Sequence, residues 1–417
     1  MGSRRVVVTG IGAITPLGKS VSEYWQGLES GMSGCDYIQQ FDTSKFKTRF
    51  ACEIKDFDPT QYLDKKEARK IDRYCQLALI ASDQAVQDAG INKDNVDVDR
   101  VGVIFASGIG GLITFQEEVM NFAAGDGTPR FNPFFIPKMI LDIAAGQISM
   151  RNGFRGPNYA VVSACASSTN AIIDAFDNIR LNKADIIVTG GSEAVISIAG
   201  VGGFNAMKAL SERNDDPKTA SRPFDKDRDG FVMGEGSGVL ILESLDHALA
   251  RGAKIYCEVA GGGATADAHH ITAPHPEGLG AKNVMLAALR DAGMTPEDID
   301  YINVHGTSTP LGDIAETKAI LGVFGDHAYN LNISSTKSMT GHCLGAAGAL
   351  EALACILAVT KDVIPPTINH FTDDPELDPK LNFTFNQAQY RPVRAALSNT
   401  FGFGGHNASV IMKKYQA

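Results

Sequence analysis

The sequence predicts an α/β fold. Short apolar runs that favour β-strands end repeatedly in glycine-rich or small-residue turns, and helical patterns follow them. The chain has 43 glycines among 417 residues, and many of them lie in these turns. This length exceeds the usual size of one domain, so we expect either two intimately packed halves or one large α/β unit.

A repeated layout favours two halves. The stretch 159–181 reads as a short strand, a loop of small residues and a helix, and the stretch 331–359 has the same order. The first loop carries Cys165 and the second carries His342. Sequence identity between the halves is faint, so the repeat rests on the pattern alone. We place the halves at residues 1–253 and 254–417.

Each expected strand is a run of β-favouring apolar residues, and each expected helix has apolar residues three or four positions apart. The first half should begin with a strand and glycine turn over 5–18, a helix with its entry over 64–90 and a buried strand over 101–105. A loop and helix over 131–147 follow, and they could cover a subunit contact. The half then continues with the strand and helix of 159–181, a strand and glycine turn over 185–193, and a strand over 238–243. In the second half we expect strands over 255–260, 299–305, 331–334 and 409–412, helices over 281–292 and 344–359, and a glycine-rich segment over 397–405.

Composition and charge exclude several classes of protein. The net charge of −10 argues against general nucleic-acid binding, which needs a basic surface. Seven cysteines are spread along the chain without a C-x-x-C pair, which indicates free thiols in a reducing compartment. No stretch of eighteen uncharged apolar residues occurs, so we expect no membrane span and a cytoplasmic protein.

Cys165 lies where an apolar run, 159–162, passes through small residues into a helical pattern. A sharp strand-to-helix turn presents a nucleophile at the top of a sheet, as in esterases. The positive end of the helix is expected to lower the pKa of the thiol. The alternative is a buried structural cysteine, which is the commoner fate of a free thiol. This stretch alone leaves both interpretations open.

Two histidines lie at similar junctions. His305 ends an apolar strand and is followed by small hydroxyl residues, a position where open α/β sheets bind ligands. His342 precedes a helix, whose N-terminus disfavours the imidazolium, so we expect a neutral imidazole that donates a hydrogen bond. Either histidine alone could be structural. Together with Cys165, they suggest one constellation.

A metal site is a weaker alternative. His269, His270 and His275 cluster near Asp267. Adjacent histidines point in different directions, and the stretch lacks an H-x3-H face, so the pattern argues against a catalytic metal.

Four motifs carry a specific resemblance. They are VSACASS at 162–168, NVHGTSTPLGD at 303–313, KSMTGH at 337–342 and SNTFGFGGHN at 398–407. In this order they resemble the motifs of the β-ketoacyl-acyl-carrier-protein synthases, most closely the elongating type II enzymes of bacterial fatty-acid synthesis, and the resemblance runs from Val6 to Lys413. A Cys-His-His set separates this class from initiating synthases and thiolases, and Cys165 excludes relatives that only decarboxylate. The resemblance implies a thiolase-like fold, two similar βαβαβ halves in a five-layer α/β/α/β/α sandwich, and a homodimer.

The resemblance also implies a chemistry. Cys165 would accept an acyl chain from acyl carrier protein, and His305 and His342 would stabilise the enolate formed when malonyl-carrier protein loses carbon dioxide. The backbone N–H groups of Cys165 and Phe401 would hold the tetrahedral oxyanion. Lys337, with Glu351, would order the His342 loop. No bound cofactor is implied for catalysis, because phosphopantetheine arrives on the carrier protein.

Further positions match the family's binding residues. Thr307 and Thr309 would bind the phosphopantetheine arm, Thr272 and His270 would line its entrance, and Phe401 with Gly402 would gate the acyl chain. The resemblance also places Ile109 and Phe204 in the acyl pocket, together with partner-subunit residues near 131–135. It implies that the carrier protein docks on Lys65, Arg69 and Lys208. It further implies a structural monovalent cation bound by Asn303, Glu351, Ser398 and Asn399. Ordinary core packing is the alternative for Ile109 and Phe204.

Two other functions compete with condensation. A cysteine hydrolase would use Cys165 and one histidine, but it leaves the second histidine unexplained and lacks an orienting Asp or Asn. A non-catalytic scaffold or chain-length partner would not need Cys165 and both histidines. The sequence leaves open which acyl chain length is preferred. It also leaves open whether the enzyme acts in fatty-acid or polyketide-like synthesis, and whether it belongs to the type I or the type II elongating class.

Overall fold

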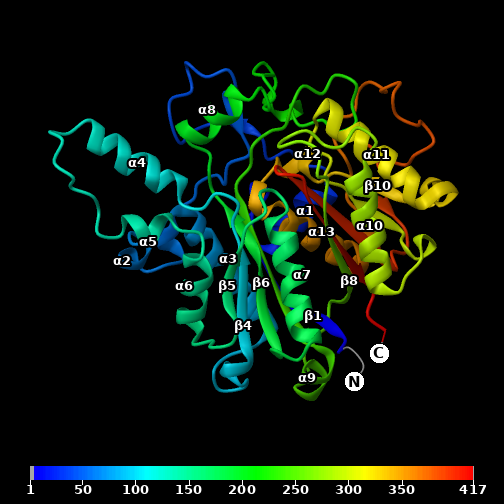
Figure 1. The fold of residues 1–417 in the computed structure, drawn as a ribbon, viewed down its shortest axis with the longest axis horizontal. Helices are drawn as coiled ribbons and strands as arrows, with labels where there is room; N and C mark the ends of the chain where they lie inside the picture. Colours follow the sequence, from blue (N-terminus) through cyan, green and yellow to red (C-terminus); the bar gives the residue numbers. More distant parts are fainter. Residues whose placement is uncertain (1–3, 417) are drawn as a thin grey trace.

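The computed structural model describes residues 4–416 and shows a ten-stranded mixed sheet made of two halves (Figure 1). The first half contains, in spatial order, β5 (Asn158–Val161), β4 (Val101–Ala106), β6 (Ile186–Glu193), β7 (Gly236–Ser244) and β1 (Val6–Ile14). The second contains β8 (Cys257–Ala266), β14 (His406–Lys413), β13 (Ala395–Gly402), β9 (Tyr301–Asn303) and β10 (Asn332–Ser334). A short antiparallel pairing of β1 with β8 joins the halves.

Helices form three layers around the two half-sheets. α7 (Ser167–Arg180) and α13 (Ala347–Lys361) pack against each other and against strands of both halves. The outer layers hold α3 (Arg73–Ala89) and α6 (Ile143–Asn152) on the first half, and α10 (Leu279–Ala292) and α11 (Pro310–Phe324) on the second (Figure 1). This α/β/α/β/α arrangement confirms the thiolase-like fold expected from the sequence.

The two halves repeat the same strand pairing. β4 is parallel to β5 and β6, β6 is antiparallel to β7, and β7 is antiparallel to β1. In the second half, β9, β10, β13, β14 and β8 repeat this pattern. Because every strand of the large sheet before residue 254 lies on one side of the β1–β8 pair, we propose the halves 1–253 and 254–417.

Close packing of α3 on β1 explains one glycine of the first strand, Gly12. Asp72 caps α3 by accepting a hydrogen bond from the backbone N–H of Tyr74, and Gly90 ends the helix in the left-handed region. A Cβ atom at Gly12 would lie 2.0 Å from the carbonyl oxygen of Ala81 on α3. The helix can approach the strand only because this position has no side chain.

The remaining elements are smaller. The helices are α1 (Val21–Glu29), α2 (Lys65–Ala68), α4 (Leu112–Ala123), α5 (Phe135–Met139), α8 (Ile198–Ala206), α9 (Leu245–Ala250) and α12 (Lys337–Thr340), and the short strands are β2 (Asp36–Tyr37), β3 (Phe50–Ala51), β11 (Val363–Ile364) and β12 (Gln389–Tyr390). The entry expected before α3 is the separate one-turn helix α2. The expected strand over 255–260 continues to Ala266, because glycines 261–263 let α10 and α7 lie close to it.

One helical stretch among residues 4–416, Leu344–Lys361, is long and apolar enough to cross a bilayer by length and composition. Within the protein 89% of it is buried. It includes α13, which lies in the central layer between the half-sheets. A helix surrounded by protein on every side is apolar all round, and this position accounts for its composition.

Candidate active site

A cavity of about 620 Å³ opens between the halves, and Cys165, His305 and His342 lie together in its wall. Cys165 follows β5, His305 follows β9, and His342 lies between α12 and α13. These are the three strand-to-small-residue junctions that the sequence analysis singled out. The fold brings them together because the two halves present equivalent ends of their sheets to one cavity.

A strained turn presents Cys165. Ala164 has a positive φ of 52°, which is unusual for a residue with a side chain. The Ser167 hydroxyl donates a hydrogen bond to the Ala164 carbonyl at 2.6 Å and accepts one from the Ser163 backbone N–H at 2.8 Å. α7 begins at Ser167. These contacts confirm the predicted sharp passage from strand to helix.

The Cys165 thiol is protonated in this environment. Burial raises its pKa to about 12, although the Lys337 ammonium acts in the opposite direction. The predicted net lowering of this pKa is therefore wrong, because burial of the thiol is the largest effect and raises the pKa. His342 Nε2 lies 3.1 Å from Cys165 Sγ, so the thiol has a hydrogen-bonding partner in the cavity wall.

Both imidazoles are neutral. Burial lowers the pKa of His305 and His342 well below the usual range, and the nearby Lys337 ammonium lowers both further. The expected neutral His342 is confirmed, with burial as the first cause. The two rings cross nearly perpendicularly, with their centroids 5.2 Å apart. Neutral imidazoles in a desolvated pocket can donate hydrogen bonds to a developing negative charge.

Lys337 and Glu351 form a buried ion pair behind these groups. Burial raises the pKa of Glu351 to about 7, and Lys337 opposes that rise. The carbonyl of Lys337 accepts hydrogen bonds from the Gly341 N–H at 3.0 Å and from the Ser221 hydroxyl at 2.7 Å. The pair therefore lies at the base of the turn that carries His342.

A backbone amide acts on the Cys165 thiol. The N–H of Phe403 lowers the pKa of this thiol, against the larger rise caused by burial. Phe401 is still part of β13, where it pairs with Asn407, and its ring lies 5.4 Å from that of His305. Phe401 as a source of the oxyanion amide stays a prediction. It lies within β13, which extends through Gly402, and the chain turns only after that residue.

The cavity gathers most of the other predicted residues. Thr307, Thr309, Thr272, His270, Ile109, Phe204, Gly402 and Lys208 all contribute to its wall. The hydroxyls of Thr307 and Thr309 lie 3.1 Å apart. Lys65 and Arg69 do not join this wall, because they line a separate hollow of about 410 Å³ beside α2 and α3.

Sequence analysis missed two buried carboxylates that hold the cavity wall. Glu316 on α11 accepts hydrogen bonds from the backbone N–H groups of His305 at 2.9 Å and Gly306 at 2.8 Å. Glu193, at the end of β6, accepts hydrogen bonds from the N–H groups of Gly108 at 2.8 Å and Gly345 at 3.0 Å. Glu316 shares the buried face of its helix with Asp313 and Thr317, and Glu193 is the last residue of a buried glycine-containing strand, so neither pattern predicted these contacts.

Three of the four predicted cation ligands have an oxygen that suits a cation. Asn303 Oδ1, Glu351 Oε2 and Ser398 Oγ are buried, and none has a hydrogen-bonding partner. The fourth, Asn399, has its Oδ1 occupied by the hydroxyl of Ser409 at 2.6 Å. Among residues 4–416, no group of three or more His, Cys, Asp or Glu side chains could hold a metal ion, and this includes the histidines near Asp267.

Two family models match the chain. The model described as "Beta-ketoacyl synthase, N-terminal domain" matches residues 3–248, and the one described as "Beta-ketoacyl synthase, C-terminal domain" matches residues 256–371. Solved structures agree with them. The ishigamide ketosynthase/chain length factor has a TM-score of 0.92 and 37% identity, with all of both chains covered. A ketosynthase structure described as a type II PKS acyl-carrier protein in complex with its ketosynthase bound to the hexaketide has a TM-score of 0.91 and 34% identity, covering 99% of this chain and 100% of that one.

Curated relatives match over the full length. The chain is 51% identical over 413 residues to the 3-oxoacyl-[acyl-carrier-protein] synthase 2 of Synechocystis sp. (strain PCC 6803), and 99% of each chain is covered. It is 48% identical over 418 residues to the protein of the same name from Staphylococcus aureus (strain N315), covering 100% of this chain and 99% of the relative. The chain therefore belongs to the β-ketoacyl synthase family.

Proposed function

We propose that this β-ketoacyl synthase condenses malonyl-acyl-carrier protein with a Cys165-bound acyl chain by decarboxylative Claisen condensation in fatty-acid elongation. The product is a β-ketoacyl-acyl-carrier protein two carbons longer. The observation that carries this proposal is the contact of Cys165 Sγ with His342 Nε2 at 3.1 Å, with the His305 ring beside it. The named activity of the curated relatives, 3-oxoacyl-[acyl-carrier-protein] synthase 2, supports the same reaction.

In the first half-reaction, the Cys165 sulfur attacks the thioester carbonyl of an acyl-carrier protein. A bond forms between sulfur and the acyl carbon, and the bond to the phosphopantetheine sulfur breaks. The thiol proton passes to the departing carrier thiol, and His342 Nε2 is placed to relay it. Backbone N–H groups of Cys165 and Phe401 hold the oxyanion, and such a donor typically contributes about 3 kcal/mol.

In the second half-reaction, malonyl-carrier protein loses carbon dioxide. The electron pair of the broken C–C bond forms an enolate, and its oxygen accepts hydrogen bonds from His305 and His342. The enolate carbon then attacks acyl-Cys165, the Cys165–acyl bond breaks, and the departing Cys165 thiolate takes up one proton from water to restore the thiol. Neutral donors suit this step, because they stabilise charge that appears only in the transition state and the intermediate.

We expect intact-mass spectrometry to detect a medium-chain acyl group on the wild type after mixing with acyl-carrier protein, and none on Cys165→Ala. Cys257→Ala provides the matched control, because Cys257 is a buried free thiol on β8 outside the cavity wall. It should acylate normally. Malonyl-carrier protein should convert the adduct to a β-ketoacyl-carrier protein two carbons longer. Loss of the adduct as free fatty acid would support a hydrolase, and no adduct on the wild type would support a scaffold.

We further propose a homodimer. β5 is an edge strand of the large sheet, immediately before Cys165, and Val162 beside it is 55% exposed. Phe115, Phe122, Phe131 and Phe134 are exposed along the α4–α5 region, and the ring of Phe131 stacks on that of half-buried Phe135 with the centroids 5.4 Å apart. An open strand edge beside an exposed apolar cluster fits a second copy of the chain. It would place partner residues of 131–135 near the acyl pocket.

Sedimentation velocity should therefore show a species of twice the chain mass, 2 × 44.4 kDa. Val162→Glu should shift it toward the monomer, because a carboxylate would be desolvated at the contact. Leu249→Glu is the control, since Leu249 is similarly exposed, at 56%, but lies on α9 at the opposite end of the sheet. A monomeric wild type would contradict the proposal.

Carrier-protein docking involves two groups of basic residues in our proposal. Lys208 lies at the cavity wall, where an arriving phosphopantetheine arm must pass. Lys65 and Arg69 line the separate hollow, and would contact the acidic body of the carrier rather than its arm.

The seven cysteines are all buried free thiols, which supports our proposal of a cytoplasmic, reducing location.

We also propose that Asn303, Glu351 and Ser398 can hold a structural monovalent cation, because each offers a buried oxygen without a hydrogen-bonding partner. Such an ion would supply positive charge beside Glu351 and would take no part in bond making. Asn399 contributes less, since its side-chain oxygen is already used.

Potassium or sodium chloride should then raise the thermal unfolding midpoint more than choline chloride at equal ionic strength. Ser398→Ala removes one oxygen ligand and should remove this difference. Equal midpoints in all three salts would contradict the cation site.

A further inference from the structure

The segment 222–230 forms hydrogen bonds to the turn that carries Thr307 and Thr309. Ser308, between the two threonines, has a positive φ of 68°. Its hydroxyl accepts a hydrogen bond from the Arg222 N–H at 3.0 Å, and its carbonyl accepts one from the Gly230 N–H at 3.1 Å. A residue with a side chain keeps such a conformation only when its surroundings enforce it.

The Arg228 side chain forms hydrogen bonds to the next two residues of the turn. Its Nε donates to the Thr309 carbonyl at 3.3 Å, and its Nη2 donates to the Pro310 carbonyl at 3.0 Å. The side chain is 2% exposed and forms ion pairs with Asp313 at 3.4 Å and Asp374 at 2.6 Å. The planar guanidinium can reach two successive carbonyls and two carboxylates at once, which a lysine ammonium cannot do in one position.

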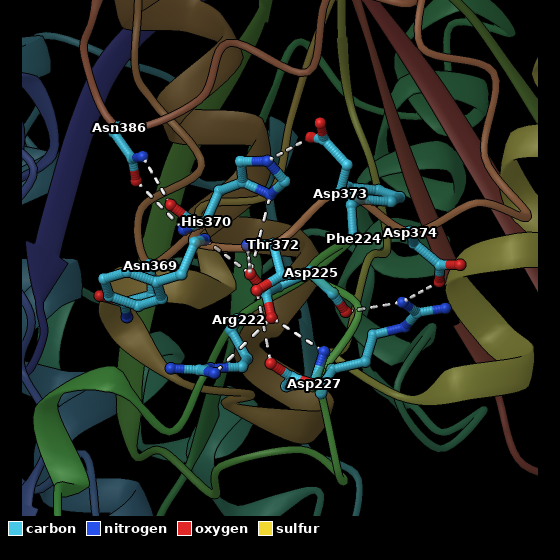
Figure 2. Close-up of polar contacts among 12 residues, drawn as sticks. Arg222, Phe224, Asp225, Asp227, Asn369, His370, Thr372, Asp373, Asp374 and Asn386 are labelled. Atoms are coloured by element: carbon cyan, nitrogen blue, oxygen red, sulfur yellow. Dashed lines mark hydrogen bonds and ion pairs between the residues drawn. The ribbon is translucent and has the colours of Figure 1, made fainter.

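The segment that carries Arg228 is itself anchored. Asp225 is fully buried, and its Oδ2 accepts hydrogen bonds from the backbone N–H groups of Phe371 at 2.6 Å and Thr372 at 2.8 Å. Its Oδ1 accepts one from the Asp227 N–H at 2.9 Å. Figure 2 shows Asp225 at the centre of these contacts. The 371–374 loop, the 222–230 segment and the threonine turn thus form one connected assembly.

We propose that Arg228 is a positioning residue for the phosphopantetheine arm of the carrier protein. It fixes the backbone at Thr309 and Pro310, so that the hydroxyls of Thr307 and Thr309 stay 3.1 Å apart in the cavity wall. The arm is then received by two hydroxyls already in place, without the cost of ordering the turn on binding. This inference rests on the proposed function, because it assigns that arm to the threonine pair.

Arg228→Lys tests the role, with Arg251→Lys as the matched control. Arg251 also forms an ion pair with a fully buried carboxylate, that of Glu243, at 2.6 Å, but it lies beside α9 outside the cavity wall. The KM for acyl-carrier protein should rise about tenfold in Arg228→Lys, as expected for the loss of one or two hydrogen bonds that hold the binding hydroxyls. Alkylation of Cys165 by iodoacetamide, which has no such arm, should change less than about twofold by the same reasoning. Arg251→Lys should leave both values unchanged.

A double-mutant cycle separates positioning from general loosening. If Arg228 acts through the threonines, Thr307→Val and Arg228→Lys together should raise KM little more than either substitution alone. Fully additive effects, an unchanged KM in Arg228→Lys, or an equal loss in the alkylation rate would each overturn the inference. Should Arg228→Lys fail to fold, Asp374→Asn weakens the same guanidinium contact at a partly accessible residue and should give the same pattern at smaller amplitude. A wild type that forms no acyl adduct would instead refute the proposed function.

Discussion

One buried charge influences the thiol of Cys165 and the imidazoles of His305 and His342. The Lys337 ammonium is nearly excluded from solvent and is paired with Glu351. It lowers the pKa of His305 and His342, and it acts to lower that of the Cys165 thiol as well. Because the cavity wall is desolvated, this effect is much larger than it would be in water. A lysine here therefore helps to keep two imidazoles uncharged while favouring the thiolate form of Cys165 that the proposed reaction requires.

The fold provides the place where such a charge can be buried. Two half-sheets with the same strand pattern enclose α7 and α13, and Cys165 and Glu351 lie at or within these central helices. The reacting groups approach from turns at equivalent ends of the two halves, and the loops behind those turns are held by buried carboxylates and by Arg228. Precise placement in this protein thus depends on polar contacts to backbone atoms, which surround a cavity with a largely apolar lining.

The sequence predicted the parts of this arrangement that have a local signal. Cys165, His305 and His342 each end an apolar run before small residues, and the four motifs identified the fold. Some of the groups that sequence analysis missed, such as Glu193 and Arg228, act on backbone atoms of distant segments, and no spacing reveals those contacts. The predicted low pKa of Cys165 was wrong for a related reason, because a helix end is visible in the sequence and the depth of burial is not.

The central claim is that His305 and His342 are neutral when the enzyme works. It can be tested directly by ¹⁵N NMR of protein labelled at its nine histidines, titrated from about pH 8 to pH 5 across the usual histidine range. His305→Asn and His342→Asn would identify the two signals. A lowered pKa predicts that both imidazoles keep the shifts of the neutral ring through pH 6, where exposed histidines become protonated. Titration of either one with a midpoint near the ordinary histidine value would contradict the account.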